Sequence, residues 1–254
     1  NSAILGTDAE PGTPEFDLFI KEVRKEITVK CGQKCTAVRR IMVPSKHIDA
    51  VQDALSKALS KTVVGDPQVD GVRMGALVGL SQRDDVRDQV SKLREEAELV
   101  YGSPDSVDTT GADSIKGAFM SPMLLRANDP FNATNVHEVE AFGPVSTLMP
   151  YDTIEDAVAL SKMGKGSLCC SITTHDKNVA ADFVRNAASM HGRILVLDRE
   201  SAKESTGHGS PLPLLVHGGP GRAGGGEEMG GLRGVKHYLQ RTAIQGHPSM
   251  LTAI

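Results

Sequence analysis

Short apolar runs alternate with amphipathic segments along most of this 254-residue chain, and this alternation restricts the possible folds more than any other feature. The strand-like runs lie at residues 2–6, 40–43, 99–101, 119–125, 145–148, 167–173 and 194–197. Buried strands that alternate with helices are typical of a mostly parallel sheet with helices on its faces. The sequence therefore predicts an α/β fold, a three-layer αβα domain.

Capping residues and apolar spacing predict where the helices begin. Thr13 followed by Pro14 indicates a helix start, because proline suits the first helical position. Apolar residues then recur at helical spacing, at Phe16, Ile20, Val23, Ile27 and Cys31. This pattern predicts a helix with Cys31 on its buried face, and Gly32 should end it. Further helix starts are expected at Ser45, at Ser81 with Asp84, at Thr153 and at Asp176.

A second cysteine lies where this first helix should give way to the strand at 40–43. Cys35 follows Gly32 and has Lys34 and Arg39 close to it in sequence. A thiol on a connection between a helix and a strand can reach a ligand, and nearby cations favour the nucleophilic thiolate. The other interpretation is a small buried apolar residue, as for most cysteines outside disulfides. The spacing alone leaves both interpretations open.

Composition excludes several classes of protein. The formal net charge of −4 gives no indication of a nucleic-acid or membrane surface. No apolar run could span a bilayer, and no signal peptide is evident. Four cysteines, at 31, 35, 169 and 170, fit a reducing compartment better than a disulfide framework. We expect a cytoplasmic protein without nucleic-acid or membrane partners. Because the chain starts at Asn1 and enters a strand-like run at once, we also expect it to be a piece of a longer protein.

The C-terminal part lacks the alternation. Residues 199–234 are rich in glycine and have no periodicity, and such long irregular segments are usually functional or form interfaces. Residues 238–244 are predicted to form a last strand, which we expect to pair with another chain because it has few neighbours in sequence. We therefore expect a homo-oligomer that is formed through this C-terminal strand.

Three other kinds of site have weaker support. Residues 219–224 fit G-x-G-x-x-G, but the strand and helix that should flank a nucleotide loop are missing. Cys31 and Cys35 have no second pair at zinc spacing, and His208 and His217 lie in the irregular segment, so no metal site is expected. A cysteine protease would need a histidine base near Cys35, and no protease signature surrounds that residue.

An acidic candidate stands before another strand. Glu140 precedes Phe142, Gly143 and Pro144, which form a turn directly before the run at 145–148. Most glutamates are exposed surface carboxylates, which is the simple interpretation. Loops that strands position often carry sites, which favours a functional one.

These segments together resemble the aldehyde dehydrogenase superfamily. Residues 32–35 (GQKC) are similar to its catalytic-cysteine motif, and 140–145 (EAFGPV) to its E-x-F-G-P-V motif. Residues 217–219 and 223–230 are similar to its glycine-rich C-terminal segment, and the resemblance runs from residue 1 to residue 246. Residues 200–213 and 235–242 resemble the members that act on a ring-opened acyl-CoA in phenylacetate degradation.

The resemblance implies roles for three residues. Cys35 would attack the aldehyde as thiolate, and its backbone N–H would help to hold the oxyanion. Glu140 would hydrogen-bond the nicotinamide ribose of NADP or NAD, and Phe142 would pack near the nicotinamide ring. The general-base glutamate, the oxyanion asparagine and the nucleotide-fold lysine of the family would all lie N-terminal to this sequence. Most members carry asparagine where this chain has Asp198.

The resemblance also implies an organisation and a function. Residues 1–235 would form the catalytic domain and residues 236–254 an oligomerisation strand and tail. The chain would be the thiol-bearing part of an NAD(P)-dependent enzyme that oxidises a semialdehyde, with a CoA-linked aldehyde as the implied substrate. We expect the isolated chain to be inactive. Two alternatives stay open: a CoA-acylating aldehyde dehydrogenase, and a non-catalytic oligomerisation module.

Overall fold

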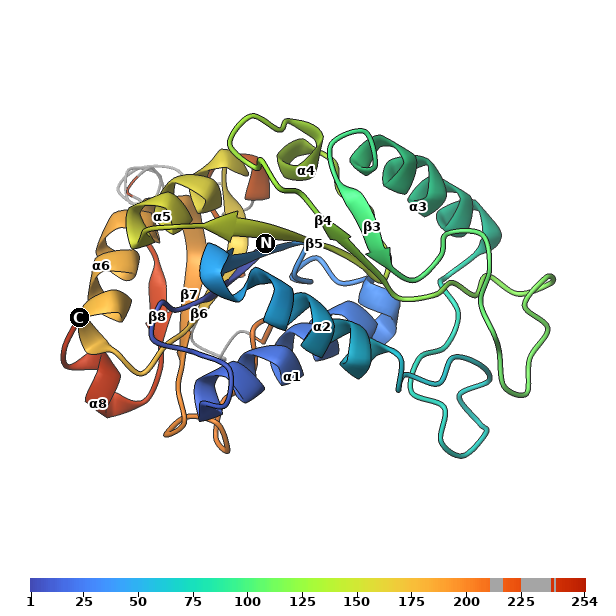
Figure 1. Ribbon diagram of the computed structural model, residues 1–254, viewed down its shortest axis with the longest axis horizontal. Coiled ribbons are helices and arrows are strands. Elements are labelled where there is room, and N and C mark those ends of the chain that lie inside the picture. Colours follow the sequence, from blue (N-terminus) through green and yellow to red (C-terminus); the bar gives the residue numbers. More distant parts are fainter. Residues whose placement is uncertain (211–216, 225–238, 240) are drawn as a thin grey trace, which may run out of the picture. The chain divides into compact units, whose positions relative to one another are not determined.

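The computed structural model describes residues 1–210, 217–224, 239 and 241–254 (Figure 1). The strands are β1 (Ser2–Leu5), β2 (Arg40–Pro44), β3 (Glu98–Tyr101), β4 (Met123–Arg126), β5 (Val145–Tyr151), β6 (Ser167–Thr173), β7 (His191–Leu197) and β8 (Ala243–Gln245). They form an eight-stranded sheet in the order β3-β4-β5-β2-β1-β6-β7-β8. The chain divides into two compact parts, residues 19–150 and residues 1–18 with 151–254.

The sheet is mostly parallel, as the alternation predicts. The pairs β4–β5, β1–β6, β6–β7 and β7–β8 are parallel, and β3–β4 is antiparallel. The strands β1, β2, β6 and β7 are almost entirely buried. Strands that are covered on both faces read as continuous apolar runs, which is why the sequence shows them so clearly. The α/β prediction is confirmed.

Residues 19–150 form a part with its own helices. The helices are α2 (Ile48–Leu59), α3 (Leu80–Leu93) and α4 (Asn135–Glu138), together with most of α1 (Pro14–Thr28). Helices α2 and α3 lie on opposite faces of the strands of this part (Figure 1). Each buries an apolar stripe, which includes Val51 and Leu55 in α2 and Val86 and Val90 in α3. This part contains Cys35, Glu140 and Phe142.

The other part carries α5 (Ile154–Met163), α6 (Lys177–Ala187) and the short α8 (Pro248–Leu251). Two of its helix starts agree with the sequence prediction. Thr153 forms a capping box with Asp156, and the Asp176 carboxylate accepts a hydrogen bond from the Asn178 backbone N–H at 2.8 Å. Leu18, Leu195 and Leu197 form a small core cluster of this part.

Two predicted caps are wrong. Helix α2 begins at Ile48 after a 3-10 turn (Ser45–His47), and no side chain caps it. Helix α3 begins at Leu80, and extended Gly79 occupies the capping position in place of Ser81. In both places, a polar residue within three positions of the true start matches the capping pattern. Such patterns fix a helix start only to within a few residues.

The first helix is shorter than the apolar spacing predicts. It ends at Thr28, and residues Val29–Gly32 form a 3-10 turn in which Lys30 and Cys31 have φ values of 54° and 53°. Cys31 is buried as predicted, but it reaches the interior from this turn and not from the face of the helix. The strand-like run at 119–125 likewise yields only β4, from Met123 to Arg126.

The C-terminal strand pairs within the chain. Strand β8 lies parallel to β7, with Ile244 opposite Ile194. It covers the end of the predicted 238–244 strand, of which Tyr238 and Gln240 lie outside the described residues. Pairing with another chain stays a prediction, as does the oligomerisation role of residues 236–254.

The G-x-G-x-x-G candidate at 219–224 lies against the start of β6. The Arg222 N–H donates to the Lys165 carbonyl at 2.8 Å, and the Gly219 N–H donates to the Gly224 carbonyl at 3.1 Å. A short 3-10 turn (Gly221–Ala223), and not a helix, forms within it. The described part of this segment therefore packs its backbone closely on neighbouring loops.

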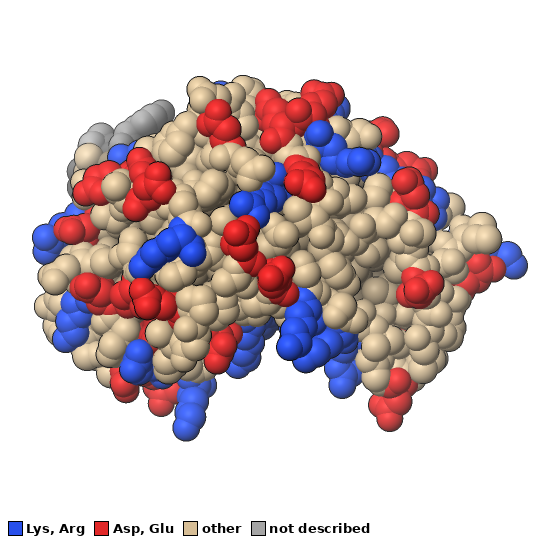
Figure 2. Space-filling model, viewed as in Figure 1, with Lys and Arg blue, Asp and Glu red and all other residues tan. Residues whose placement is uncertain are grey.

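The helices of the described residues are all too short or too polar to cross a membrane. Acidic and basic side chains are interspersed over the face drawn in Figure 2. The absence of nucleic-acid and membrane partners stays a prediction.

Candidate active site

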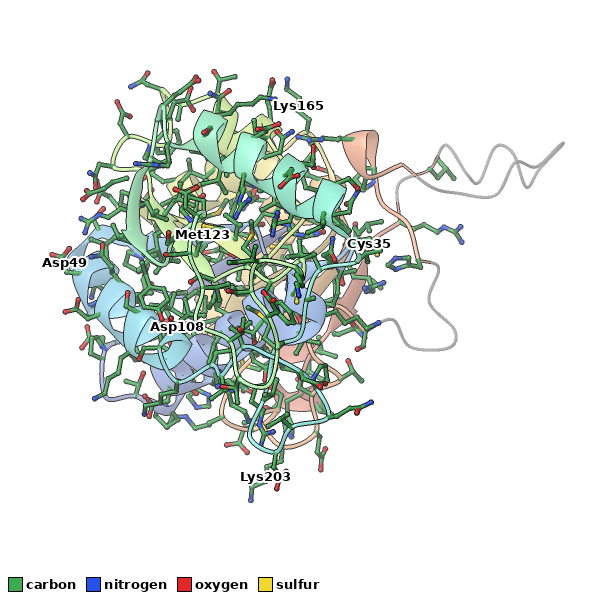
Figure 3. The ribbon with its side chains drawn as sticks, turned by 90° about the vertical axis from the view of Figure 1, so that its right-hand side faces the viewer. Cys35, Asp49, Asp108, Met123, Lys165 and Lys203 are labelled. Atoms are coloured by element: carbon green, nitrogen blue, oxygen red, sulfur yellow. The ribbon has the colours of Figure 1, made fainter. Side chains whose placement is uncertain are left out.

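Cys35 lies on the connection between α1 and β2, where the sequence places it. Its side chain is exposed, while Thr36, Ala37 and Val38, which lead into β2, are buried. Figure 3 shows Cys35 beside helix α3. The Gln33 side-chain carbonyl accepts a hydrogen bond from the Val78 N–H at 2.9 Å. This bond ties residues 32–39, which we call the cysteine loop, to the residues before α3. A reagent in solvent can therefore reach this thiol.

Cys31 has the opposite environment. Its thiol is buried and donates a hydrogen bond to the Gly75 carbonyl, with Sγ and O 2.8 Å apart. Burial raises the pKa of Cys31 to about 11, because a buried thiolate loses its hydration. At neutral pH Cys31 is therefore a thiol and a poor nucleophile.

The cysteine loop touches the loop before β5 at two glycines. Gly32 has φ +66°, and a Cβ built there would lie 2.2 Å from the Gly143 carbonyl oxygen. Only glycine permits both this left-handed backbone and this close approach. The contact places the Cys35 loop against the turn that follows Glu140 and Phe142.

Arg39 connects the same two loops through hydrogen bonds. The guanidinium donates through Nη2 to the Gly32 carbonyl at 2.6 Å and through Nη1 to the Gly143 carbonyl at 2.5 Å. Its Nε lies 4.0 Å from the Glu140 carboxylate, and the guanidinium lies 5.3 Å from the centroid of the Phe142 ring. Burial lowers the pKa of Arg39 to about 10, although Glu140 and Glu26 oppose this shift. The side chain is therefore still a cation at neutral pH.

The structure thus brings together the three residues that the sequence proposes as the site. Cys35, Glu140 and Phe142 come from two loops that Gly32, Gly143 and Arg39 hold in contact. Glu140 keeps 46% of its side chain exposed and can accept hydrogen bonds from a ligand. Phe142 is half-buried. The arrangement offers a thiol, a carboxylate and an aromatic ring on adjoining loops.

The two cations near Cys35 in sequence are both directed at carboxylates. Lys34 Nζ lies 2.7 Å from buried Glu26 on α1, and Arg39 faces Glu140. The Lys34 pair anchors the cysteine loop to the preceding helix. The sequence marks these cations as activators of the thiol, whereas their ion pairs with Glu26 and Glu140 hold the loop in place.

Asp198 belongs to the other part of the chain. It is buried at the end of β7, where its carboxylate accepts from the Ser201 N–H at 2.9 Å and lies 3.6 Å from His175 Nδ1. The Ser201 hydroxyl in turn accepts from the Asp198 N–H at 3.0 Å. Asp198 therefore forms the turn that begins the irregular segment.

The remaining candidate ligands have protein partners. His208 is buried with its Nε2 3.2 Å from the Cys169 sulfur and its Nδ1 2.9 Å from the Ser171 hydroxyl. His217 Nδ1 lies 3.1 Å from Arg193. Within the described ranges, no three His, Cys, Asp or Glu side chains are grouped so that they could hold a metal ion.

The sequence matches the aldehyde dehydrogenase family over residues 12–244. The chain belongs to this family. It is 45% identical over 220 residues to a 3,4-dehydroadipyl-CoA semialdehyde dehydrogenase of Aromatoleum evansii, a match that covers 87% of this chain and 43% of that protein. It is 52% identical over 182 residues to the protein MaoC of Klebsiella aerogenes, covering 71% and 52%. The chain thus spans about half the length of these curated relatives.

Solved aldehyde dehydrogenases share the fold. A betaine aldehyde dehydrogenase of Staphylococcus aureus in complex with NAD+ superposes with a TM-score of 0.75 at 22% identity, covering 94% of this chain and 44% of that one. A succinic semialdehyde dehydrogenase of Streptococcus pyogenes in complex with NADP+ gives a TM-score of 0.71 at 22% identity, covering 88% and 44%. This likeness shows that the chain has the fold of the catalytic part of the family.

Sequence reasoning missed what holds the aldehyde dehydrogenase motifs together. Arg39 stands inside the cysteine segment but reads there only as a nearby cation. The signal that could have identified it is its place directly before a buried strand, where a charged side chain must find partners inside the protein. Gln33 was recognised only as part of the cysteine motif. Its hydrogen bond to Val78 could not be predicted, because the two residues are 45 positions apart in sequence.

Proposed function

We propose that this chain is the thiol-bearing catalytic domain of an NAD(P)-dependent aldehyde dehydrogenase, with Cys35 as the nucleophile. One observation carries the proposal: the exposed thiol of Cys35 stands on a loop that is fixed against the loop of Glu140 and Phe142. Family membership supports the reaction class, and the contrast between exposed Cys35 and buried Cys31 supports the choice of residue.

The chemistry of Cys35 follows from thiolate reactivity. Its sulfur adds to the aldehyde carbon, which gives a hemithioacetal whose oxygen takes up a proton. Loss of the aldehyde hydrogen with its electron pair, together with release of the hydroxyl proton to solvent, leaves a thioester on Cys35. Water cleaves the carbon–sulfur bond of this thioester, which releases the carboxylic acid and restores the thiol. The chain would thus hold the substrate covalently through both halves of the reaction.

Oxidation needs an acceptor for that electron pair. NAD+ or NADP+, when bound, supplies a two-electron oxidant that takes the hydrogen as hydride. The half-exposed carboxylate of Glu140 suits the ribose of such a group, because its two oxygens can accept hydrogen bonds from neighbouring hydroxyls. Phe142, with its ring against Arg39, offers an apolar surface for the nicotinamide. These two residues would therefore hold the nicotinamide end.

The substrate that we propose is a CoA-linked semialdehyde. The support is the relative of Aromatoleum evansii, whose name describes it as acting on 3,4-dehydroadipyl-CoA semialdehyde, at 45% identity over most of this chain. We propose that the isolated chain does not complete the reaction. The alignments cover only 43% and 52% of the two curated relatives, and the family's base and nucleotide fold would lie outside this sequence.

The test compares two cysteine variants of the complete enzyme, in which this chain is joined to its cofactor-binding half. Cys35→Ser should abolish NAD(P)H formation with a CoA-linked semialdehyde, and Cys31→Ser should retain most of it. The isolated chain should form no NAD(P)H with any aldehyde. Release of a trapped Cys35 acyl group by CoA instead of water would favour the acylating alternative. An active Cys35→Ser enzyme would refute the nucleophile assignment.

We propose also that β8 takes part in a homo-oligomer. The support is its place at the end of the strand order, where one edge of a strand can pair with another chain. Light scattering tests this, because a strict monomer at high concentration would contradict it.

A further inference from the structure

We propose that Arg39 is a positioning residue for the active site, and that it acts through Glu140 to set the affinity for the cofactor. The inference rests on the proposed function. Its basis is that a single buried guanidinium joins the loop of the nucleophile to the loop of the cofactor ligands.

Arg39 links segments that are distant in sequence. Its two carbonyl acceptors, Gly32 and Gly143, lie 7 and 104 residues away. Gly32 stands three positions before Cys35, and Gly143 stands three positions after Glu140. One rigid planar group therefore fixes the register between the nucleophile and the carboxylate. Lysine could not do this, because a single ammonium cannot present a planar fork to two loops.

Stability alone is a weak reason for such a residue. Arg39 is only 9% exposed, and burying a cation carries a desolvation cost that offsets much of the stabilising free energy of its hydrogen bonds. An apolar residue of similar volume is often as good or better for stability. The two carbonyl bonds could serve loop packing. The contact with half-exposed Glu140 adds nothing that packing requires, and it bears on a group that is directed to solvent.

The contacts suggest what Arg39 does for the cofactor ligands. Its positive charge lies 4.0 Å from the Glu140 carboxylate and restrains that flexible side chain near the cysteine loop. The same guanidinium lies over the Phe142 ring and restrains its orientation. Restraining the side chains that hold the cofactor before it binds lowers the entropic cost of binding. Loss of Arg39 should therefore weaken cofactor binding more than aldehyde binding.

The experiment is a double-mutant cycle in the complete enzyme, with Arg39→Met, Glu140→Gln and the double variant. Arg39→Met alone should raise both the Kd of NAD(P)+, measured by calorimetric titration without aldehyde, and KM for NAD(P)+ about tenfold, and it should leave KM for the aldehyde nearly unchanged. In the Glu140→Gln background, Arg39→Met should add less than about a threefold further increase, because its effect passes through Glu140. Arg39→Lys should recover little, since it keeps the charge but not the fork. Arg126→Met, which removes an arginine from β4 with its own partner Asp49, is the matched control and should leave both KM values unchanged.

Three outcomes would overturn the inference: effects of Arg39→Met and Glu140→Gln that multiply fully, equal changes in both KM values, or full rescue by lysine. If Arg39→Met does not fold, Arg39→Lys in both backgrounds gives the same cycle. Failure of the proposed function is distinguishable, because it would appear as an inactive wild-type enzyme or an active Cys35→Ser enzyme.

Discussion

Cys31 and Cys35 stand four positions apart, yet the thiol of Cys31 is buried on the Gly75 carbonyl while the thiol of Cys35 is exposed. Three consecutive residues with left-handed backbone, Lys30, Cys31 and Gly32, turn the chain at the first of these cysteines. The same turn that buries the first sulfur presents the second. This division of roles between neighbouring thiols underlies the account of the site.

Gly32→Ala should destabilise the chain and disturb the cysteine loop. The added methyl would lie 2.2 Å from the Gly143 carbonyl oxygen and would also meet a left-handed backbone. Gly71→Ala is the matched control, because Gly71 has φ +88° with nothing within 4 Å of the added Cβ. The left-handed conformation alone costs about 1 kcal/mol.

Urea unfolding should therefore show a larger loss for Gly32→Ala than for Gly71→Ala, by about 1 kcal/mol or more. Equal losses would mean that the two loops separate at no cost, and the close contact would then not hold the site together.

His137 should make stability depend on pH. Its Nδ1 lies 3.2 Å from the Arg40 guanidinium, which only donates, so Nε2–H donates to the Pro130 carbonyl at 2.8 Å. Burial lowers the pKa of His137, and Arg40 lowers it further, while the Pro130 bond, Glu96 and Glu138 oppose the shift. The unfolded chain, with a histidine pKa near 6.5, therefore binds the proton more readily than the folded chain.

The contribution of His137 is accordingly present above pH 6.5 and is lost as the pH falls toward the pKa of the folded state. The melting temperature should fall between pH 7 and pH 5 by more in the wild type than in His137→Gln. Parallel pH profiles for the two proteins would contradict this.

Asp198→Asn should be tolerated, and Asp198→Ala should not. An asparagine side-chain oxygen can still accept from the Ser201 N–H, while alanine leaves that buried turn without its acceptor. The expected loss for alanine is about 1–2 kcal/mol in the free energy of unfolding, and that for asparagine is much smaller. Thermal or urea unfolding measures both, and equal losses would show that the charge beside His175 matters more than the turn.

The sequence was sufficient to predict the sheet because its buried strands are continuous apolar runs too short for helices, and amphipathic helical segments alternate with them. Thr153 and Asp176 were also readable, since their side chains bond only to nearby backbone. Ser45 and Ser81 match the same capping pattern, but the helices begin at Ile48 and Leu80. Local sequence does not distinguish a true capping position from a polar residue a few positions away.

The sequence predicted the residues of the candidate site but not the contacts that connect its two loops. Cys35, Glu140 and Phe142 stand in motifs, and their placement on touching loops is consistent with the family. The contacts of Arg39 with Gly32 and Gly143 join residues across 104 positions, and they depend on a fold that brings two loops together. The end of α1 was misjudged for a related reason: helical spacing continues to Cys31, while contact with Gly75 favours the turn.

The central claim is that Cys35 is the reactive thiol of this chain. The most direct measurement is brief treatment of the folded chain with a limiting amount of iodoacetamide at pH 7.5, followed by peptide mass spectrometry of all four cysteines. We expect that label accumulates at Cys35, that Cys35→Ser abolishes this fast labelling, and that Cys31→Ser leaves it unchanged. Label spread evenly over Cys31, Cys35, Cys169 and Cys170, or fast labelling that survives in Cys35→Ser, would contradict it.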